Sequence, residues 1–564
     1  MSNEKETVSC QQTKCDWQSI DWKAAISYVA DLRRAIFQAT KVEDYKKVRT
    51  LTRIMLRSYE NRVLSVRRVT QTNRGKGTAG VDKIIVKTAK ARGELVDVLG
   101  QYDVIKADPT KRVYIPKANG KKRPLGIPTV FDRCVQAIVK NALEPIWEAQ
   151  FEDSSHGFRP GRCPKDAMER IFSLLCGRGS RKWVFDADIK GAFDNISHEK
   201  LMELIGNFPA RDQIQCWLKA GYLEDGAYYD TESGTPQGGV ISPLLANIAL
   251  HGMEEVLGIK FNPWDNSLHK ESVGLVRYAD DFVVICHTKE QAEEAKQTLI
   301  GWLAQRGLQL SEEKTRIVHI TDGFDFLGFN VRQFERTDRK SGVKLIIRPS
   351  AKSVKAIRKK LKETFRRCRG SNVAKLVKEV NPIIRGWADY YKGSVSKRTF
   401  TKLDDYLFTL QVRWTKWQHS KKSYKWRLQK YWGQWRGKDR YVFGEEDRYM
   451  LKFQWTPIRR HIGVRRFAAF DDPDLQEYWT KRKEQLTRNN LRTKVQKQIA
   501  RTQQYVCPVC GDTLANGEVI EEHHHQPRSE GGNDTLANLR LVHIYCHQAV
   551  HHGNQKTEEV VSTA

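Results

Sequence analysis

Residues 275–286 read LVRYADDFVVIC, a run of strand-forming residues that is interrupted by two adjacent aspartates, Asp280 and Asp281. Val, Ile, Phe and Tyr favour strands, whereas Asp is depleted from strand interiors. The stretch therefore predicts two strands joined as a hairpin, with the acidic pair at its tip, where carboxylates can face solvent and a metal ion. A plain acidic turn without a metal is the alternative interpretation.

A second stretch, WVFDADIKGAFDNI at residues 183–196, also leads from apolar strand formers into carboxylates, here Asp186 and Asp188. Mg²⁺ prefers oxygen ligands and keeps several waters, so two or three carboxylates from separate strands are the expected protein ligands. Two such ions about 3.5–4 Å apart can activate a hydroxyl and stabilise a leaving pyrophosphate. Together the two stretches predict a phosphoryl-transfer site with two metal ions.

The charge of the chain indicates a polyanionic partner. Its 564 residues include 97 Lys and Arg against 67 Asp and Glu, a net charge of +30, and nucleic acid is the leading candidate for such a surplus. Residues 351–440 hold 26 Lys and Arg but 6 Asp and Glu. The same region contains Trp387, Trp414, Trp417, Trp426, Trp432 and Trp435. These rings are interpreted as stacking surfaces for bases, with a Trp-containing helical core as the alternative.

Cysteine use and hydropathy indicate the compartment. Eleven scattered cysteines suit reduced thiols better than a disulfide framework. The polar N-terminal stretch has no apolar signal core, and no run of 18 apolar residues occurs. We therefore expect an intracellular, cytoplasmic protein of bacterial type that is not bound to a membrane.

Periodicity divides the chain into helical and mixed regions. Helical spacing of apolar residues runs through 21–69 and returns from 353 to about 490, whereas strand signals fall between them. Those strand signals are RVYIPK, WVFDADI, VGLVRYADDFVVIC, RIVHI, FDFLGFNV and KLIIRP. The fold class is therefore α+β with several domains.

The order of motifs resembles that of group II intron-encoded proteins, the reverse transcriptase-maturases. The motifs are GKGTAGVD (75–82), RVYIPKANGKKRPLGIPTVFDR (112–133), GFRPGR (157–162), DADIKGAFDNI, GTPQGGVISPLLANI, RYADDFVV, LSEEKT, FDFLGFNV and NPIIRGWADYYKG (381–393). The last resembles the signature of the maturase thumb, called domain X. The resemblance implies a right-hand polymerase with fingers, palm and helical thumb.

Family roles carry over to individual positions. The resemblance implies that Asp188, Asp280 and Asp281 bind two Mg²⁺ ions and that Phe193 lies under the incoming sugar, where it excludes a 2′ hydroxyl. Phe193 as an ordinary core residue is the alternative. The other implied nucleotide contacts are Arg123, Lys117, Gln237, Gly238 and Lys314. For Lys117 a mobile basic loop, and for Lys314 a solvated lysine, are the alternatives. Asp186 and Asp194 are interpreted as structural.

The C-terminal residues predict a zinc site. Cys507 and Cys510 are separated by two residues, and so are His543 and Cys546. This spacing is typical of a tetrahedral Cys3His zinc site, and a redox pair would leave the second pair unexplained.

The residues around this site resemble an HNH endonuclease with a ββα-metal fold. The resemblance implies that His524 is the general base and that Asn538 holds the local geometry. It implies a divalent ion bound by His523 and His547, joined by His551. His543 stands where many relatives have cysteine. A DNA-binding zinc knuckle without nuclease activity is the alternative.

We expect five domains: a helical N-terminal extension (1–85), fingers and palm (86–345), thumb or domain X (346–440), a basic DNA-binding region (441–500) and an HNH module (501–564). The resemblance implies a reverse transcriptase of a mobile intron that assists splicing and cuts the second strand of target DNA during retrohoming. Its partners would be group II intron RNA, target DNA and deoxynucleoside triphosphates, and monomer and dimer both stay open. The alternatives are a splicing factor with an inactive polymerase, and a reverse transcriptase of another lineage.

Overall fold

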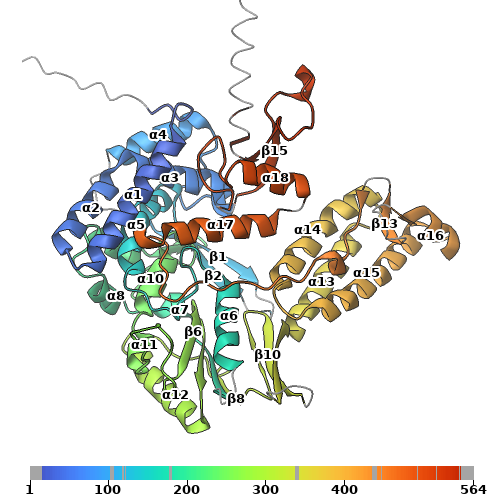
Figure 1. The fold of residues 1–564 in the computed structure, drawn as a ribbon. Coiled ribbons are helices and arrows are strands. Elements are labelled where there is room, and N and C mark those ends of the chain that lie inside the picture. The colour runs from blue at the N-terminus through green and yellow to red at the C-terminus, as the bar shows by residue number, and fades with distance from the viewer. Residues whose placement is uncertain are drawn as a thin grey trace, which may run out of the picture.

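The computed structural model describes residues 15–101, 107–116, 120, 122–176, 181–336, 342–434, 441–445, 448–491, 493–515, 518–544, 546–547 and 550. Lys117, His551 and Trp435 lie outside the described residues. In Figure 1 the N-terminal helices cover one side of a central mixed region, and helices α13 to α16 project from its other side. No helix in the described ranges combines the length and apolarity that a bilayer crossing requires.

The N-terminal extension is helical, as the periodicity of residues 21–69 predicts. It comprises α1 (Trp22–Lys41), α2 (Tyr45–Arg57), α3 (Tyr59–Arg67) and α4 (Ala89–Gly100). Asp21, Asp44 and Ser58 cap the first three helices by accepting a hydrogen bond from a backbone N–H in the first turn. Helices α1, α2 and α3 pack against the long buried helix α5 (Val130–Glu148).

The fingers contain a four-stranded sheet in the order β2-β1-β4-β5. β1 (Thr110–Pro116) and β2 (Lys122–Ile127) form an antiparallel pair, while β4 (Tyr222–Glu224) and β5 (Ala227–Tyr229) extend the sheet. The first strand was expected at RVYIPK. The last two are only three residues long, too short for a periodic pattern to identify them.

The palm sheet has the order β6-β7-β3-β8. Its strands are β3 (Trp183–Asp188), β6 (Gly274–Tyr278), β7 (Asp281–Cys286) and β8 (Arg316–His319). Alternate side chains enter two different cores: Phe185, Phe282 and Val284 join the core shared with the N-terminal extension, whereas Val184 and Val283 join the core shared with the thumb. The central sheet therefore links the two halves of the polymerase.

Short helices surround the palm sheet. α6 (Pro164–Leu175) packs on β6, and α12 (Lys289–Ala304) packs on β3 and β7. The others are α7 (Ala192–Asn195), α8 (His198–Ile205), α9 (Arg211–Lys219), α10 (Ser242–Ala249) and α11 (Met253–Val256).

The thumb follows a three-stranded sheet of β9 (Phe324–Phe326), β10 (Phe329–Glu335) and β11 (Val343–Pro349). Its helices are α13 (Ala351–Arg367), α14 (Val373–Tyr391), α15 (Lys397–Gln418) and α16 (Tyr424–Tyr431). The NPIIRGWADYYKG signature lies mostly in α14. Tyr390 and Tyr391 donate hydrogen bonds from their hydroxyls to the carbonyls of Leu327 and Gly328. The signature thus attaches the thumb to the loop between β9 and β10.

The expectation of helices from 353 to about 490 is wrong for residues 432–475. β12 (Trp432–Gly433), β13 (Val442–Glu445) and β14 (Arg448–Tyr449) form a small sheet on the thumb. Asn381 of α14 holds it, donating to the Tyr449 carbonyl and accepting from the Leu451 N–H. Local helical periodicity cannot predict strands that depend on a side chain 60 to 70 residues earlier.

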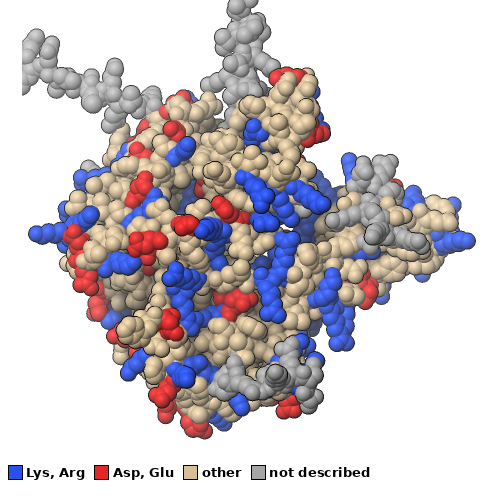
Figure 2. All heavy atoms as spheres, in the orientation of Figure 1, with Lys and Arg blue, Asp and Glu red and all other residues tan. Residues whose placement is uncertain are grey.

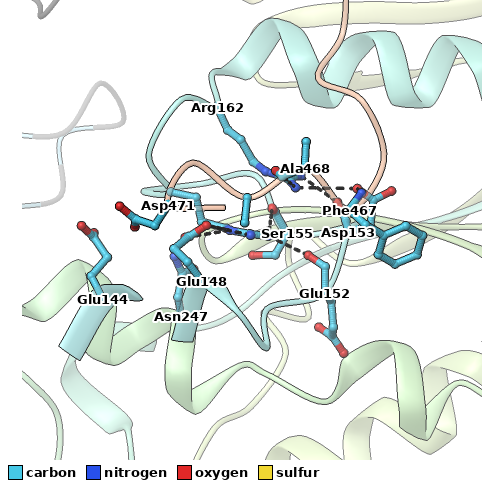
Figure 3. Close-up of polar contacts among 12 residues, drawn as sticks. Glu144, Glu148, Glu152, Asp153, Ser155, Arg162, Asn247, Phe467, Ala468 and Asp471 are labelled. Atoms are coloured by element: carbon cyan, nitrogen blue, oxygen red, sulfur yellow. Dashed lines mark hydrogen bonds and ion pairs between the residues drawn. The ribbon is translucent and has the colours of Figure 1, made fainter. Parts of the chain in front are cut away.

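Residues 456–475, here called the strap, then cross back over the palm. Figure 3 shows Arg162 between Asp153 and the strap. Arg162 donates to the carbonyls of Asp153 and Ala468, and Asp153 accepts from the Phe467 N–H at 3.0 Å. Asp471 pairs with Arg33 of α1. The strap therefore ties the palm to the N-terminal extension.

The C-terminal module follows α17 (Gln476–Asn490) and α18 (Lys494–Thr502). It contains the antiparallel pair β15 (Ile520–His524) and β16 (Leu539–His543), followed by helical residues that include Cys546 and His547. This ββα arrangement and the palm, fingers and helical thumb confirm the predicted α+β multidomain fold class.

Candidate functional site

The predicted palm carboxylates lie together at one end of the palm sheet. β3 and β7 are antiparallel, and Asp188 is the direct cross-strand partner of Asp281. Asp280 occupies the turn between β6 and β7, next to Ala279 with a positive φ of 59°. The backbone joins the strands further, because Ile189 N donates to the Asp280 carbonyl at 3.3 Å. The hairpin predicted from LVRYADDFVVIC is thus confirmed, with Asp281 as the first residue of its second strand.

Burial, together with neighbouring carboxylates, makes Asp280 and Asp281 hard to ionise. Burial, the charge of Asp280 and the neighbouring Asp188 raise the pKa of Asp281 to about 7. Burial and Asp188 also raise the pKa of Asp280. Lys314 Nζ lies 2.7 Å from Asp188 Oδ2, and this pairing offsets part of the repulsion. Like-charged groups are held together here at an energetic cost, which is typical of a site that binds cations.

A second acidic residue of β3, Asp186, has a different environment. It forms an ion pair with Arg316 at 3.1 Å, and burial raises its pKa to about 6. Arg316 stands opposite Asp186 on β8. The pairing within the sheet fits the expected structural role of Asp186.

Buried polar groups support the acidic hairpin from behind. Arg277 of β6 is fully buried and donates to Asn247 Oδ1 at 3.1 Å and to Ser155 Oγ at 2.8 Å. Gly157 of the GFRPGR motif lies so close to this hairpin that a Cβ would stand 2.3 Å from Ala279 N. The motif is therefore a backbone platform for the acidic turn, a role that its sequence did not reveal.

Four of the predicted nucleotide residues, Phe193, Arg123, Gln237 and Gly238, lie between the palm and the fingers. Phe193 and Gln237 line the same cavity of about 70 Å³, together with Thr235 and Trp217. Arg123 of β2 donates from Nε to Gln237 Oε1 at 2.9 Å. Gly238 has φ +148°, and a Cβ there would stand 2.4 Å from the carbonyl oxygen of Gly126. Only glycine permits this approach of the PQG turn to the fingers strand.

Phe193 is 7% exposed and also belongs to the hydrophobic core. Its ring meets Phe158 edge to face at 6.1 Å. Phe193 therefore packs in the core and also lines the cavity, so a core position does not exclude its predicted place under the incoming sugar.

Two groups of possible ligands in the described part of the chain have donor atoms all within 4.8 Å of one another. One is Cys507, Cys510, His543 and Cys546, and the other is Cys163, Asp166 and His461. In the second group Arg482 donates to Asp166 at 2.6 Å. The Arg482 guanidinium already supplies the positive charge beside Asp166, so we interpret Cys163, Asp166 and His461 as a contact that anchors the strap to the palm. The palm carboxylates are not among these two groups.

The Cys3His group fits zinc. All four side chains are buried, and Cys510 Sγ lies 3.4 Å from His543 Nδ1. Zinc binds sulfur at about 2.3 Å and nitrogen at about 2.0–2.1 Å in tetrahedral geometry, which brings ligand atoms to this order of separation. His543 therefore takes the position of a cysteine without disturbing the cluster.

The HNH residues surround the β15-β16 pair. His523 and His547 have ring centroids 5.1 Å apart. His524 Nε2 lies 2.7 Å from Asp534 Oδ1. Asn538 accepts from the Gln526 N–H at 2.7 Å, so it fixes the loop beside β15 as the resemblance implied.

Two carboxylates that contact the histidines of this module were not predicted from the sequence. Asp534 orients His524, and Glu521 Oε2 lies 2.7 Å from His547 Nδ1. Orienting carboxylates of this kind fix the tautomer of a working histidine. Neither residue lies in a recognisable motif, and only the fold brings each to its histidine.

The tryptophans of the thumb are mostly structural. Trp414 and Trp432 are buried at 3% and 7%, and Trp387 packs on Tyr391 and Phe400. Trp417 is 50% exposed. The interpretation of these rings as a base-stacking surface is therefore wrong for the first three. The positive charge remains on the outside, and Figure 2 shows Lys and Arg gathered down the middle of one face beside the thumb.

Family models match four parts of the chain. They are the N-terminal domain of reverse transcriptase (residues 17–99), reverse transcriptase or RNA-dependent DNA polymerase (115–331), the group II intron maturase-specific domain (354–432) and HNH endonuclease (507–553). Their order along the chain is the order expected from the motifs.

Curated relatives agree with these matches. Protein YkfC of Escherichia coli K12 is 37% identical over 300 residues, covering 46% of this chain and 77% of YkfC. The group II intron-encoded protein LtrA of Lactococcus lactis subsp. cremoris is 37% identical over 284 residues, covering 40% and 47%. An uncharacterized 91 kDa protein in the cob intron of Schizosaccharomyces pombe is 32% identical over 356 residues, covering 50% and 43%. The alignments thus span about half the length of the last two relatives.

The acidic hairpin, the maturase-type thumb and the Cys3His module occur in one chain, each inside a matching domain. The chain belongs to the family of group II intron-encoded reverse transcriptases that carry a maturase-specific domain and an HNH endonuclease domain.

Proposed function

We propose that this protein copies its intron RNA into DNA with two Mg²⁺ ions bound by Asp188, Asp280 and Asp281. The observation that carries the proposal is the cross-strand pairing of Asp188 with Asp281 beside the Asp280 turn. When bound, the ions activate the primer 3′ hydroxyl and stabilise the leaving pyrophosphate. The three carboxylates would bind the positively charged ions. The raised pKa values of Asp280 and Asp281 are typical of buried acidic groups that lie close together and bind cations.

The pocket residues select and hold the nucleotide. Phe193 closes the space beside the 2′ carbon, so a deoxyribose fits and a ribose clashes. Gln237 is held in place by Arg123, and the backbone at Gly238 approaches the base pair. Arg123 and Lys117 would bind the triphosphate, and Lys314, already beside Asp188, would meet the pyrophosphate.

The thumb is proposed to bind the group II intron RNA and assist its splicing. Residues 351–440 carry most of the surplus charge of the chain, and phosphate contacts dominate affinity for RNA. Lys359 and Lys360 on α13 are exposed. The basic region 441–500 would hold target DNA, although its strap portion also anchors the palm.

The C-terminal module is proposed to cut the second strand of target DNA. Cys507, Cys510, His543 and Cys546 would hold a structural Zn²⁺, and His523 and His547, joined by His551, a divalent ion. His524, oriented by Asp534, would take the proton from the attacking water. Retrohoming then combines reverse splicing of the RNA, this cleavage, and DNA synthesis from the new 3′ end. The site of action is proposed to be the cytoplasm.

The test of the nuclease assignment is His524→Ala in the reconstituted protein–RNA particle. Cleavage of an end-labelled target duplex is followed on each strand separately. The strand opposite the insertion site should be cut about 10² to 10⁴ times more slowly, the usual contribution of a general base. Zinc content and primer extension should stay unchanged, because no zinc ligand or palm residue is altered.

The neighbouring His525 is exposed and provides the matched control, since His525→Ala should cut both strands normally. Wild-type cleavage of the second strand by His524→Ala would contradict the role of His524. The module would then be a DNA-binding knuckle.

A further inference from the structure

The zinc module touches the N-terminal extension through one buried arginine. Arg67, the last residue of α3, is 8% exposed. Its Nη2 lies 3.8 Å from Cys546 Sγ and 3.6 Å from Glu518 Oε1. Both of those groups belong to the C-terminal module, some 450 to 480 residues along the chain. A cation of the first domain therefore reaches the ligand cluster of the last.

Apolar contacts surround this arginine. The Arg67 guanidinium stands 4.8 Å from the centroid of the Trp22 ring. Trp22 packs against both the N-terminal core and the core of the zinc module. Lys23 also lies against the module, since a Cβ on Gly511 would stand 2.7 Å from its Cγ. The interface is thus built from α1, α3 and the loop that follows Cys510.

A zinc-bound Cys3His site would carry a negative charge, which attracts the Arg67 guanidinium. With Zn²⁺ bound, three thiolates and a neutral imidazole leave a net charge of −1 on a buried centre. A buried charge is costly unless a partner compensates it. Arg67 is close enough to donate to a ligand sulfur, and hydrogen bonds to metal ligands from outside the coordination sphere tune metal affinity.

We propose that Arg67 is a positioning residue that couples zinc loading to docking of the nuclease module on the N-terminal extension. Zinc would fix the Cys546 sulfur in the position where the Arg67 guanidinium reaches it, so loading strengthens docking. Coupling of two equilibria is reciprocal, so docking must also strengthen zinc binding. The N-terminal extension and the DNA-cutting module would then be held in a fixed relation only when zinc is present. The inference rests on the zinc site proposed above.

The first experiment uses the variants Arg67→Met and Arg67→Lys in the full-length protein. Met keeps the apolar stem and removes the charge, whereas Lys keeps the charge without the planar fork. Transfer of zinc to the chelator 4-(2-pyridylazo)resorcinol is followed by absorbance. Arg67→Met should lose zinc roughly 10 to 100 times more readily, and Arg67→Lys should fall between it and wild type. Arg68 is exposed, so Arg68→Met serves as the matched control and should behave as wild type.

The second experiment measures docking of the module, and its main comparison uses the wild-type protein alone. Hydrogen exchange of the amides in α1 around Trp22, in α3 and around Gly511 is compared before and after zinc is removed from the wild-type protein. Removal should speed exchange on both sides of the interface, and Arg67→Met should speed it even with zinc present. Primer extension on an RNA template reports that the polymerase remains folded.

Three outcomes are distinguishable. A wild-type protein without bound zinc would contradict the zinc assignment itself. The coupling alone would be contradicted if Arg67→Met retained zinc as well as the wild type does and its interface amides exchanged as slowly as those of the zinc-loaded wild type. Unchanged exchange in α1 and α3 on zinc removal from wild type would contradict it as well, even if Arg67→Met does not fold.

Discussion

Single residues in this protein serve two purposes where the palm meets the fingers. Phe193 is part of the core and also lines the pocket of Gln237. Phe193→Val should enlarge that pocket and raise ribonucleotide incorporation at least about tenfold, equivalent to about 1.4 kcal/mol of lost discrimination. Competition between deoxy- and ribonucleotides during primer extension measures it. Phe208→Val, in the same core but outside the pocket, is the control, and equal discrimination in both variants would remove the steric role of Phe193.

A buried carboxyl behind the hairpin makes stability depend on pH. Burial raises the pKa of Glu152 to about 7, although Arg277 opposes the rise and Glu254 adds to it. Because this value exceeds the usual 4.5, the folded protein keeps a proton that the unfolded chain releases. Stability therefore falls as pH rises from about 4.5 to about 7, by at most about 3 kcal/mol.

Glu152→Gln should remove much of this fall, because the amide oxygen can still accept from the Glu254 N–H and carries no charge. Melting temperatures from pH 5 to 8 measure the effect. Glu255→Gln alters an exposed neighbour and should follow the wild-type curve. A Glu152→Gln curve parallel to wild type would mean that Glu152 ionises normally.

Residue types alone predicted the acidic hairpin and the Cys3His group, because each depends on short spacing along the chain, whereas Gln237 and Gly238 were expected from the family resemblance. Asp534 and Glu521 were missed, since their histidine partners are set by the pairing of β15 with β16. Trp414 and Trp432 were misinterpreted for a related reason. Charge density does not say which way a ring faces. Trp414 of α15 packs against Tyr431, and Trp432 of β12 packs against Phe443, so both rings lie inside.

Among the elements, strands that read as continuous runs of strand-forming residues were predictable, whereas segments without such a run were not. β3, β6 and β7 match the expected stretches closely, whereas the strap and the sheet of β12, β13 and β14 depend on residues far away in the sequence. The strap illustrates the limit well. Its anchors Asp153 and Asp166 lie about 300 residues earlier, so no local pattern encodes the contact.

Helix α13 provides a prediction at this scale. Its buried side comprises Ile357, Leu361, Thr364 and Phe365. The basic side chains therefore lie on the exposed side, which we propose binds RNA. Each neutralised phosphate adds about 0.7 to 0.9 to the slope of log affinity against log salt. Replacing Lys359, Lys360, Arg366 and Arg367 by Gln should therefore lower that slope by at most about 3 to 4 in filter-binding titrations with the intron RNA.

The control for α13 replaces Lys289 and Lys296 of α12 on the palm, of which Lys289 is exposed and Lys296 is half-buried. This pair should leave the slope unaltered. A quadruple variant with the wild-type slope would mean that the basic side of α13 only faces solvent. Arg367, which pairs with Glu379 at 2.8 Å, is expected to contribute least of the four.

The described residues form three hydrophobic cores. One core joins the N-terminal extension to the palm, the second joins the palm to the thumb, and the third belongs to the zinc module. The palm sheet contributes to the first two, and Trp22 packs against the first and the third. We therefore expect the proposed DNA synthesis, RNA binding and DNA cleavage to use different surfaces of one connected body, so that each can be removed by a local change.

The most direct test of this account is Asp280→Ala assayed in two reactions with one preparation. Primer extension on an RNA template with Mg²⁺ should fall at least about a thousandfold, since metal ligation supplies several kcal/mol of charge stabilisation. RNA binding and assisted splicing of the intron should remain within about twofold of wild type. Asp322→Ala, an exposed palm residue, should retain both activities. Extension that survives in Asp280→Ala, or splicing that is lost in parallel with it, would contradict a metal-dependent polymerase site separate from the RNA-binding surface.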